Sequence, residues 1–309
     1  MNIDDKVLVS KDAKSFRNRP VIAQYYGDDT ILRLDDSTNS FSEMLRERKK
    51  PQDVSYFANA LMDGYMLANV GVSGIFVVRY DKKDYLMTTK SDRMERKYPD
   101  TVAKLLSAFV PAELMHEPET HMMREVSEEF LPTIGDDMKI LTGMRDGVSL
   151  EKAFDGILPY SNMNFYMGTG NQFQLPGMRN GRIILMNGNI GSVMPEYTEF
   201  HAAADTNSGQ LVFKYNLWLP NHAGLSLHHS EDRLNMETGM LDIYLYRNGI
   251  LLFQLDNDMK LTGDAYVLEK NRLMPYEHKD LLLSEAFAPK ISGISSQNNI
   301  HLNDYLEIQ

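Results

Sequence analysis

The chain contains no cysteine, so disulfides and metal sites built from thiolates are both excluded. This absence favours a reducing compartment, and we expect a cytoplasmic protein. The first residues, MNIDDKVLVSKDAKSF, carry acids where a secretory signal needs a basic start and an apolar core. No apolar run approaches the roughly 18 residues of a membrane-spanning helix, so we expect no membrane partner.

Positive charge is also scarce, because 32 lysine and arginine residues face 43 acidic residues and give a formal net charge of −11. This balance disfavours nonspecific binding to nucleic acid. Two basic clusters remain, RERKK at 46–50 and DRMERK at 92–97. Charge runs of this kind are usually solvated. In the second cluster, Arg93, Arg96 and Lys97 are our candidates for binding substrate phosphate.

Periodic patterns in the first half of the chain predict three helices and a hairpin. Residues 51–70 place apolar side chains on one helical face. Two β-rich runs, 75–80 and 85–89, flank a polar turn and predict a β-hairpin. Further helices are expected over 101–110 and over 117–130, each ended by a following proline.

The second half of the chain has the pattern of strands from about residue 138 onward. Asn248-Gly249 separates two β-rich runs and is the strongest hairpin signal in the sequence. A short helix is expected at 279–287. The polar residues 291–309 form a separate C-terminal tail.

The segment REVSEE, residues 124–129, gathers three carboxylates on the helix expected over 117–130. Glu125, Glu128 and Glu129 stand at i, i+3 and i+4 and therefore share one helical face. Like charges at this spacing repel, and a divalent cation such as Mg²⁺ or Mn²⁺ would turn the repulsion into ligation. Arg124 could orient a carboxylate or contact phosphate. The simpler alternative is a solvated, charged helix surface.

The pattern Arg-Glu-x-x-Glu-Glu on a helix resembles the centre of the Nudix hydrolase signature. That resemblance implies an α+β protein, an α/β/α sandwich around a mixed β-sheet, over residues 70–290. An N-terminal extension with a helix would occupy 1–69, and an insertion would lie at about 136–195. The signature's upstream glycine and glutamate positions hold Val110 and His116 in this chain.

The resemblance also implies an activity, which is cleavage of the diphosphate linkage in a nucleoside diphosphate derivative. Glu125, Glu128 and Glu129 would bind Mg²⁺ or Mn²⁺, and Arg124 and Glu128 would take part in catalysis. Glu199, in EYTEFH, is a further candidate catalytic carboxylate. The substrate would be a nucleotide-derived small molecule or an RNA end.

A second hypothesis keeps the Nudix scaffold without its activity. The missing glycine, the insertion and the terminal segments would then serve a binding or regulatory module with a protein or RNA partner. β-rich edges are also consistent with a homodimer. For the first hypothesis, capped RNA, ADP-ribose, dinucleotides and nucleoside triphosphates are all candidate substrates.

Two histidine clusters offer other chemistry. HEPETH resembles a zinc motif, but His116 and His121 are five residues apart with Pro118 between them, so they do not share a helical face. LSLHHSED brings His228 and His229 close to two acids and could provide a general base or a metal ligand from a loop. The alternative for this segment is a polar turn.

Overall fold

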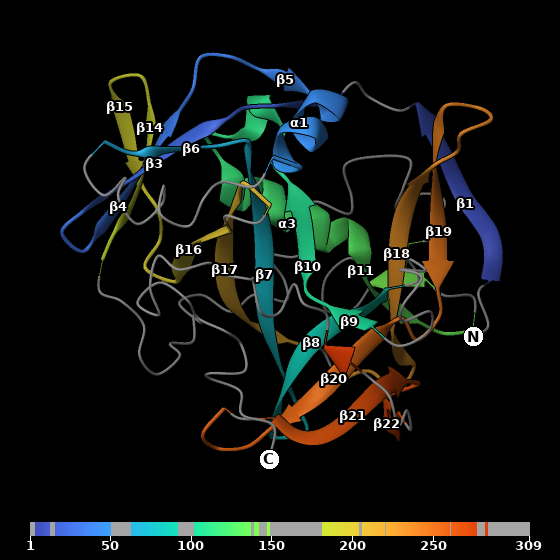
Figure 1. The fold of residues 1–309 in the computed structure, drawn as a ribbon. Coiled ribbons are helices and arrows are strands. Elements are labelled where there is room, and N and C mark those ends of the chain that lie inside the picture. The colour runs from blue at the N-terminus through green and yellow to red at the C-terminus, as the bar shows by residue number, and fades with distance from the viewer. Residues whose placement is uncertain are drawn as a thin grey trace.

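The structure is a computed structural model, and it describes residues 4–12, 16–50, 63–91, 102–136, 139–141, 147–148, 181–203, 206–219, 221–259, 261–276 and 282–283. These residues are mostly β-strands gathered in several sheets (Figure 1). Two α-helices occur among them, α1 (Phe41–Arg48) and α3 (Pro118–Glu129), with the 3-10 helix η1 (Ala112–Leu114). The predicted α/β/α sandwich is therefore wrong, because two helices do not provide a helical layer on each face of a sheet.

The largest sheet has ten strands in the order β16-β17-β7-β8-β20-β21-β22, with β10 paired to β7 and β9 paired to β8 and β23. Strands β7 and β17 are neighbours in this sheet and run parallel to each other. The strands are β7 (Asn69–Tyr80), β8 (Lys83–Ser91), β9 (Val102–Lys104), β10 (Leu106–Phe109), β16 (Thr198–Ala203), β17 (Ser208–Trp218), β20 (Ile250–Leu255), β21 (Leu261–Glu269), β22 (Arg272–Pro275) and β23 (Leu282–Leu283).

The remaining strands form three smaller sheets. The six-stranded sheet contains β1 (Asp4–Asp12), β19 (Met240–Tyr246), β18 (Leu225–Leu234), β11 (Phe130–Ile134), β12 (Lys139–Leu141) and β13 (Gly147–Val148). The five-stranded sheet contains β15 (Ile190–Val193), β14 (Ile183–Asn187), β4 (Asp29–Leu34), β3 (Val21–Tyr26) and β6 (Tyr65–Leu67). A two-stranded sheet joins β2 (Arg17–Asn18) and β5 (Asn39–Ser40).

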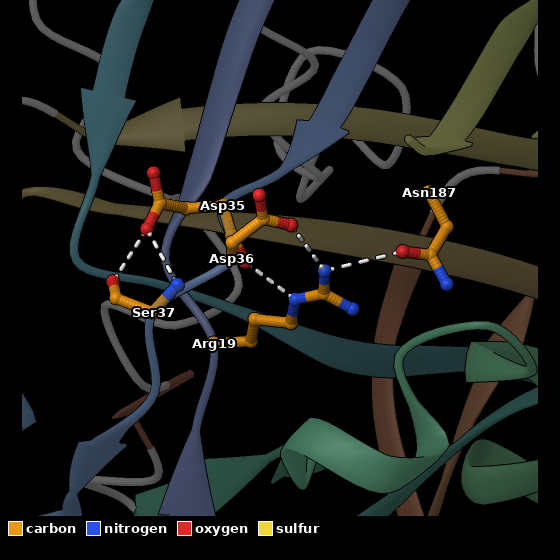
Figure 2. A network of polar contacts seen from close by, with 5 residues as sticks. All are labelled: Arg19, Asp35, Asp36, Ser37 and Asn187. Atoms are coloured by element: carbon orange, nitrogen blue, oxygen red, sulfur yellow. Dashed lines mark hydrogen bonds and ion pairs between the residues drawn. The ribbon is translucent and has the colours of Figure 1, made fainter. Parts of the chain in front are cut away.

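The N-terminal strands pair with strands from much later in the chain. β1 is antiparallel to β19, and β4 is parallel to β14. Polar contacts support the second pairing, because Arg19 donates to the Asn187 side chain over 3.1 Å and to the carbonyl of Asp35, and lies 3.5 Å from Asp36 (Figure 2). Ser37 also bonds the Asp35 carboxylate. The predicted boundaries of a domain over residues 70–290 stay predictions.

The main hydrophobic core surrounds α3, which contacts β7 and β10 of the ten-stranded sheet and β11 and β18 of the six-stranded sheet. Met122 and Val126 are completely buried on this helix and pack in one cluster with Phe76, Phe213 and Leu227. In Figure 1, α3 accordingly lies at the centre of the molecule, between these two sheets. Neither α1 nor α3, the two helices that the structure describes, has the length and apolar character needed to cross a membrane.

The predicted hairpin over 75–80 and 85–89 is confirmed by β7 and β8, which pair antiparallel through a two-residue turn. Asp81 and Lys82 in this turn have φ angles of 46° and 66°. Positive φ at both central residues is the geometry of a type I′ turn, whose twist matches that of the flanking strands. The predicted helix over 117–130 is likewise confirmed by α3.

The helix predicted over 101–110 is wrong, because this segment forms β9 and β10. β10 pairs antiparallel with residues 71–74 of β7. Gly71 permits the close approach, since a Cβ there would lie 2.9 Å from the carbonyl oxygen of Ala108. Sheet pairing with a distant segment has therefore overridden the local helical pattern.

Three other predictions are corrected or fall outside the described residues. Of the helix expected over 51–70, residues 51–62 lie outside them, and its end forms strands β6 and β7 instead. The Asn248-Gly249 turn is present, but it connects β19 of one sheet to β20 of another, so the predicted hairpin is wrong. Of the helix expected over 279–287, only 282–283 is described, as β23; the tail 291–309 lies outside the described residues.

Candidate carboxylate–histidine site

The three glutamates of REVSEE lie in the second half of α3, which ends where the chain continues directly into β11. Pro118 occupies the first turn, where its missing N–H leaves no helical hydrogen bond unmade. The apolar face of the helix is buried in the core. Arg124 lies on α3 with an exposed side chain.

The glutamate side chains are not on a solvated surface. The side chain of Glu125 is 24% exposed and that of Glu129 is 17% exposed. Glu128 is also partly buried. The alternative of a freely solvated charged face is therefore wrong for these residues, and their charges are held close to the core.

Glu125 lies beside His121, with 3.5 Å between the carboxylate Oε1 and the imidazole Nε2. The same nitrogen is 3.0 Å from the carbonyl oxygen of Phe109 on β10. Burial lowers the pKa of His121, so its ring is neutral at neutral pH. This histidine therefore contributes no positive charge to the glutamate face at that pH.

Glu129 lies beside His229 of β18, with 3.6 Å between the carboxylate Oε2 and the imidazole Nε2. His229 is completely buried, and its ring stacks on Tyr246 of β19 with 5.5 Å between centroids. Neither ring nitrogen of His229 makes a hydrogen bond to a described residue, and neither does Oε2 of Glu129. Buried polar atoms in proteins are normally hydrogen-bonded, so this pair marks a site that needs a further partner.

The end of α3 adds a field of the same sign as its carboxylates. The last carbonyls of a helix carry a partial negative charge, and a cation is favourable beside them. The last turn of α3 has no basic residue. Ser230 of β18 donates a hydrogen bond to the carbonyl oxygen of Glu128, which fixes this end of the helix to the strand.

His228 and His229 lie within the strand β18, so the loop and the polar turn considered for LSLHHSED are both wrong. Successive side chains of a strand point to opposite faces, which separates the two rings. The Nδ1 atom of His228 accepts a 3.0 Å hydrogen bond from the N–H of Asn248. Burial lowers the pKa of His228 to about 4, which identifies a neutral, structural histidine.

Glu199 of β16 lies away from the glutamates of α3. It is directly opposite Val212 on β17, whereas the neighbouring Phe213 packs in the core cluster that contains α3. Because side chains alternate along a strand, Glu199 points to the other face of the ten-stranded sheet. There it contacts Lys214 and His201. The structure therefore does not bring Glu199 to the predicted site.

The buried environment affects the pKa values of Glu199 and Lys214. Burial alone would raise the pKa of Glu199, but the hydrogen bond with His201 and the charge of Lys214 lower it overall. Burial lowers the pKa of Lys214, whose side chain is fully enclosed, against the attraction of Glu199. Glu199 and Lys214 thus form a buried pair within the ten-stranded sheet.

A further polar contact at the start of α3 was not predicted. Tyr197 and Tyr215 both donate hydrogen bonds to the carboxylate of Glu119. Burial raises the pKa of Tyr197 to about 12 and also raises that of Tyr215, so both phenols are protonated donors. These residues come from separate segments, and no local spacing in the sequence indicates their contact.

The candidate phosphate-binding residues Arg93, Arg96 and Lys97 lie outside the described residues. Within the ranges that the structure describes, no group of three or more His, Asp or Glu side chains is arranged to hold a metal ion. No family model, curated protein or solved structure matches the chain.

Proposed function

We propose that the chain is a hydrolase that depends on Mg²⁺ or Mn²⁺ and cleaves the diphosphate bond of a nucleoside diphosphate-linked substrate. The observation that supports this most strongly is the pair formed by Glu129 and the fully buried His229, in which Oε2 of Glu129 and both ring nitrogens of His229 lack a hydrogen bond to a described residue. Half-buried glutamates around the negative end of α3 make the same place suitable for a cation.

The donor chemistry of the helix fits these ions. Mg²⁺ prefers oxygen ligands, and it commonly uses one or two protein carboxylates together with water and substrate phosphates. A site of that kind does not require three protein side chains to converge before the substrate binds. Glu125, Glu128 and Glu129 are the residues that would hold the ion.

In the proposed reaction, water attacks one phosphorus atom and gives its proton to a carboxylate or histidine, and the bond from that phosphorus to the bridging oxygen breaks, so that this oxygen leaves on the other phosphate. A bound divalent ion supplies Lewis acidity and lowers the pKa of the attacking water. Glu128 would hold the ion beside the phosphates. The exposed Arg124 would contact a phosphate oxygen, where a guanidinium can form two parallel bonds. Glu199 has no part in this reaction, because it faces away from α3.

The substrate would be a nucleotide-derived small molecule or an RNA end, and Arg93, Arg96 and Lys97 would attract its phosphates. The absence of cysteine supports a cytoplasmic location for this activity. A homodimer is compatible with the exposed strand β15, which lies at the edge of the five-stranded sheet.

A second candidate is a catalytically inactive module that binds a protein or RNA. One observation favours it, because Glu125 and Glu129 already lie within 4 Å of His121 and His229. If both histidines were protonated, they would neutralise these carboxylates without a metal ion. The lowered pKa of His121 argues against this for the first pair at neutral pH.

Hydrolysis of a panel of nucleoside diphosphate derivatives with Mg²⁺ or Mn²⁺ tests the proposal. We expect turnover by the wild-type protein and its loss in Glu128→Gln, which keeps the shape of the side chain and removes its charge. Glu47→Gln on α1 changes a glutamate whose side chain is 44% exposed, so it is the matched control and should retain turnover. If no substrate were hydrolysed and neither ion raised the melting temperature, the enzyme proposal would be rejected in favour of the binding module.

A further inference from the structure

We propose that His229 is itself a ligand of the metal ion at the end of α3, and that it makes the site prefer a first-row metal ion such as Mn²⁺ or Zn²⁺ over Mg²⁺. This inference rests on the proposed function for the presence of a cation on the α3 glutamates. It adds a nitrogen ligand from β18, a strand distant from α3 in the sequence, and so assigns a class of metal.

The first argument is the state of the imidazole. His229 is completely enclosed, yet neither of its ring nitrogens is hydrogen-bonded to a described residue. Leaving a buried donor or acceptor without a hydrogen bond is unfavourable. His228, the next residue in the chain, uses a ring nitrogen to accept a backbone hydrogen bond. The contrast shows that β18 holds one structural histidine and one whose nitrogens are available to a ligand.

The second argument is geometry. The Nε2 atom of His229 and the Oε2 atom of Glu129 are 3.6 Å apart. When two ligand atoms each lie about 2.0–2.2 Å from one ion, the distance between the two ligand atoms is similar to this 3.6 Å separation. A single ion therefore fits between Glu129 and His229 with little movement. Chain connectivity maintains this approach, because Phe130 follows Glu129 directly and pairs with His229 across β11 and β18.

The orientation of the ring is also fixed. The His229 ring stacks on Tyr246 at an interplanar angle of 24°. Gly249 lies against the base of this side chain, since an added Cβ at Gly249 would be 2.7 Å from the Cβ of His229. A ligand whose ring is held by packing loses little conformational entropy when it binds an ion.

The identity of the donors indicates the class of ion. Imidazole nitrogen suits zinc, iron, copper and nickel best, and Mn²⁺, although it takes the same oxygen ligands as Mg²⁺, accepts an imidazole more readily than Mg²⁺ does. A glutamate and a histidine together therefore favour an ion that accepts both oxygen and nitrogen. Removing the imidazole should weaken the binding of such an ion far more than it weakens the binding of Mg²⁺.

Calorimetric titration of the full chain with Mn²⁺ and with Mg²⁺, without substrate, tests this preference. We expect the wild type to bind Mn²⁺ more tightly than Mg²⁺. His229→Phe keeps the stacking on Tyr246 and removes the nitrogens, and it should weaken Mn²⁺ binding at least about tenfold while changing Mg²⁺ binding less than threefold. His116→Gln, an exposed histidine, is the control and should bind Mn²⁺ as the wild type does. An unchanged Mn²⁺ affinity in a folded His229→Phe protein would overturn the inference.

A measurement on the unsubstituted protein covers the case in which His229→Phe does not fold. In protein labelled with ¹⁵N-histidine, Zn²⁺ should shift a ring nitrogen of His229 and leave those of His228 unchanged. A His229 ring that does not respond to saturating Zn²⁺ would overturn the inference equally.

The outcomes also separate this inference from the proposed activity. If His229 binds the ion but no diphosphate is hydrolysed, the metal site stands and the proposed reaction fails. If diphosphates are hydrolysed while His229→Phe keeps its Mn²⁺ affinity, the reaction stands and the role of His229 fails.

Discussion

The phenol of Tyr215 donates a hydrogen bond to the carboxylate of Glu119, which joins the first turn of α3 to the middle of β17. Tyr197 donates to the same oxygen. A bond between a neutral donor and a charged acceptor is stronger than one between neutral groups. The two tyrosines therefore hold the start of the helix against the ten-stranded sheet, while Ser230 holds its end against β18.

Tyr215→Phe should lower the free energy of unfolding by about 2 kcal/mol, because it removes one bond to a charged group from a buried position. Urea denaturation would measure the change. Tyr26→Phe removes a hydroxyl from a side chain that is 72% exposed, and it should alter stability by less than about 0.5 kcal/mol. Equal effects of the two substitutions would show that the bond to Glu119 does not stabilise the fold.

His228 predicts a dependence of stability on pH. Its pKa is about 4 in the folded protein, below the ordinary value of 6.5. Between these values the unfolded chain takes up a proton that the folded protein does not, so stability falls as the pH drops from 6.5 to about 4. The loss from this residue would be about 3 kcal/mol at most.

Denaturation curves at several pH values would measure this loss for the wild type and for His228→Gln. The variant has no group that titrates at this position, so its stability should fall less over the same interval. His116→Gln changes an exposed histidine and should keep the wild-type slope. If His228→Gln also kept that slope, His228 would not be the source of the acid sensitivity.

The buried contact between Lys214 and Glu199 predicts a stability effect without an effect on turnover. Lys214→Met leaves Glu199 without its charged partner inside the protein, and breaking such a pair costs about 3–5 kcal/mol. Replacing both residues, with Glu199→Gln in addition, should cost less than Lys214→Met alone, because no unpaired charge remains. A double variant less stable than the single one would contradict this account.

Glu199→Gln alone distinguishes the two faces of the ten-stranded sheet. Because Glu199 points away from α3, the diphosphate hydrolysis proposed above should persist in this variant, once the folded fraction is equalised, whereas Glu128→Gln should lose it. The measurement is the rate of hydrolysis per amount of folded protein in each variant. Loss of turnover in both variants would bring Glu199 back as a catalytic residue.

Local patterns were sufficient where neighbours in the sequence determine the structure. The acidic segment over 117–130 and the proline after it predicted α3, and the polar turn between 75–80 and 85–89 predicted the first hairpin. The same reasoning failed at 101–110, where the decisive contact is the pairing of β10 with residues 71–74. Nothing near either segment in the sequence shows that pairing.

The same division between local patterns and long-range pairing applies to the candidate site. The glutamate face follows from helical spacing alone. The sequence identifies His229 as part of a histidine pair, but its position beside Glu129 depends on the register of β11 and β18, which no local pattern indicates. The Asn248-Gly249 signal correctly marked a turn, yet it could not show that the chain passes from one sheet to another there.

Gly249 should influence the metal site although it carries no ligand. An added Cβ would lie 2.7 Å from the Cβ of His229 and 2.9 Å from the carbonyl oxygen of Tyr246, so the backbone or the histidine must move. Overpacking of this kind costs about 1–3 kcal/mol. Gly249→Ala should therefore lower the melting temperature and also weaken Mn²⁺ binding, because it displaces the ring of His229 from Glu129.

Comparison with Tyr215→Phe isolates the effect on Mn²⁺ binding, since that variant loses similar stability at the opposite end of α3. Equal Mn²⁺ affinity in the two variants would mean that the position of the His229 ring does not control the binding of the ion.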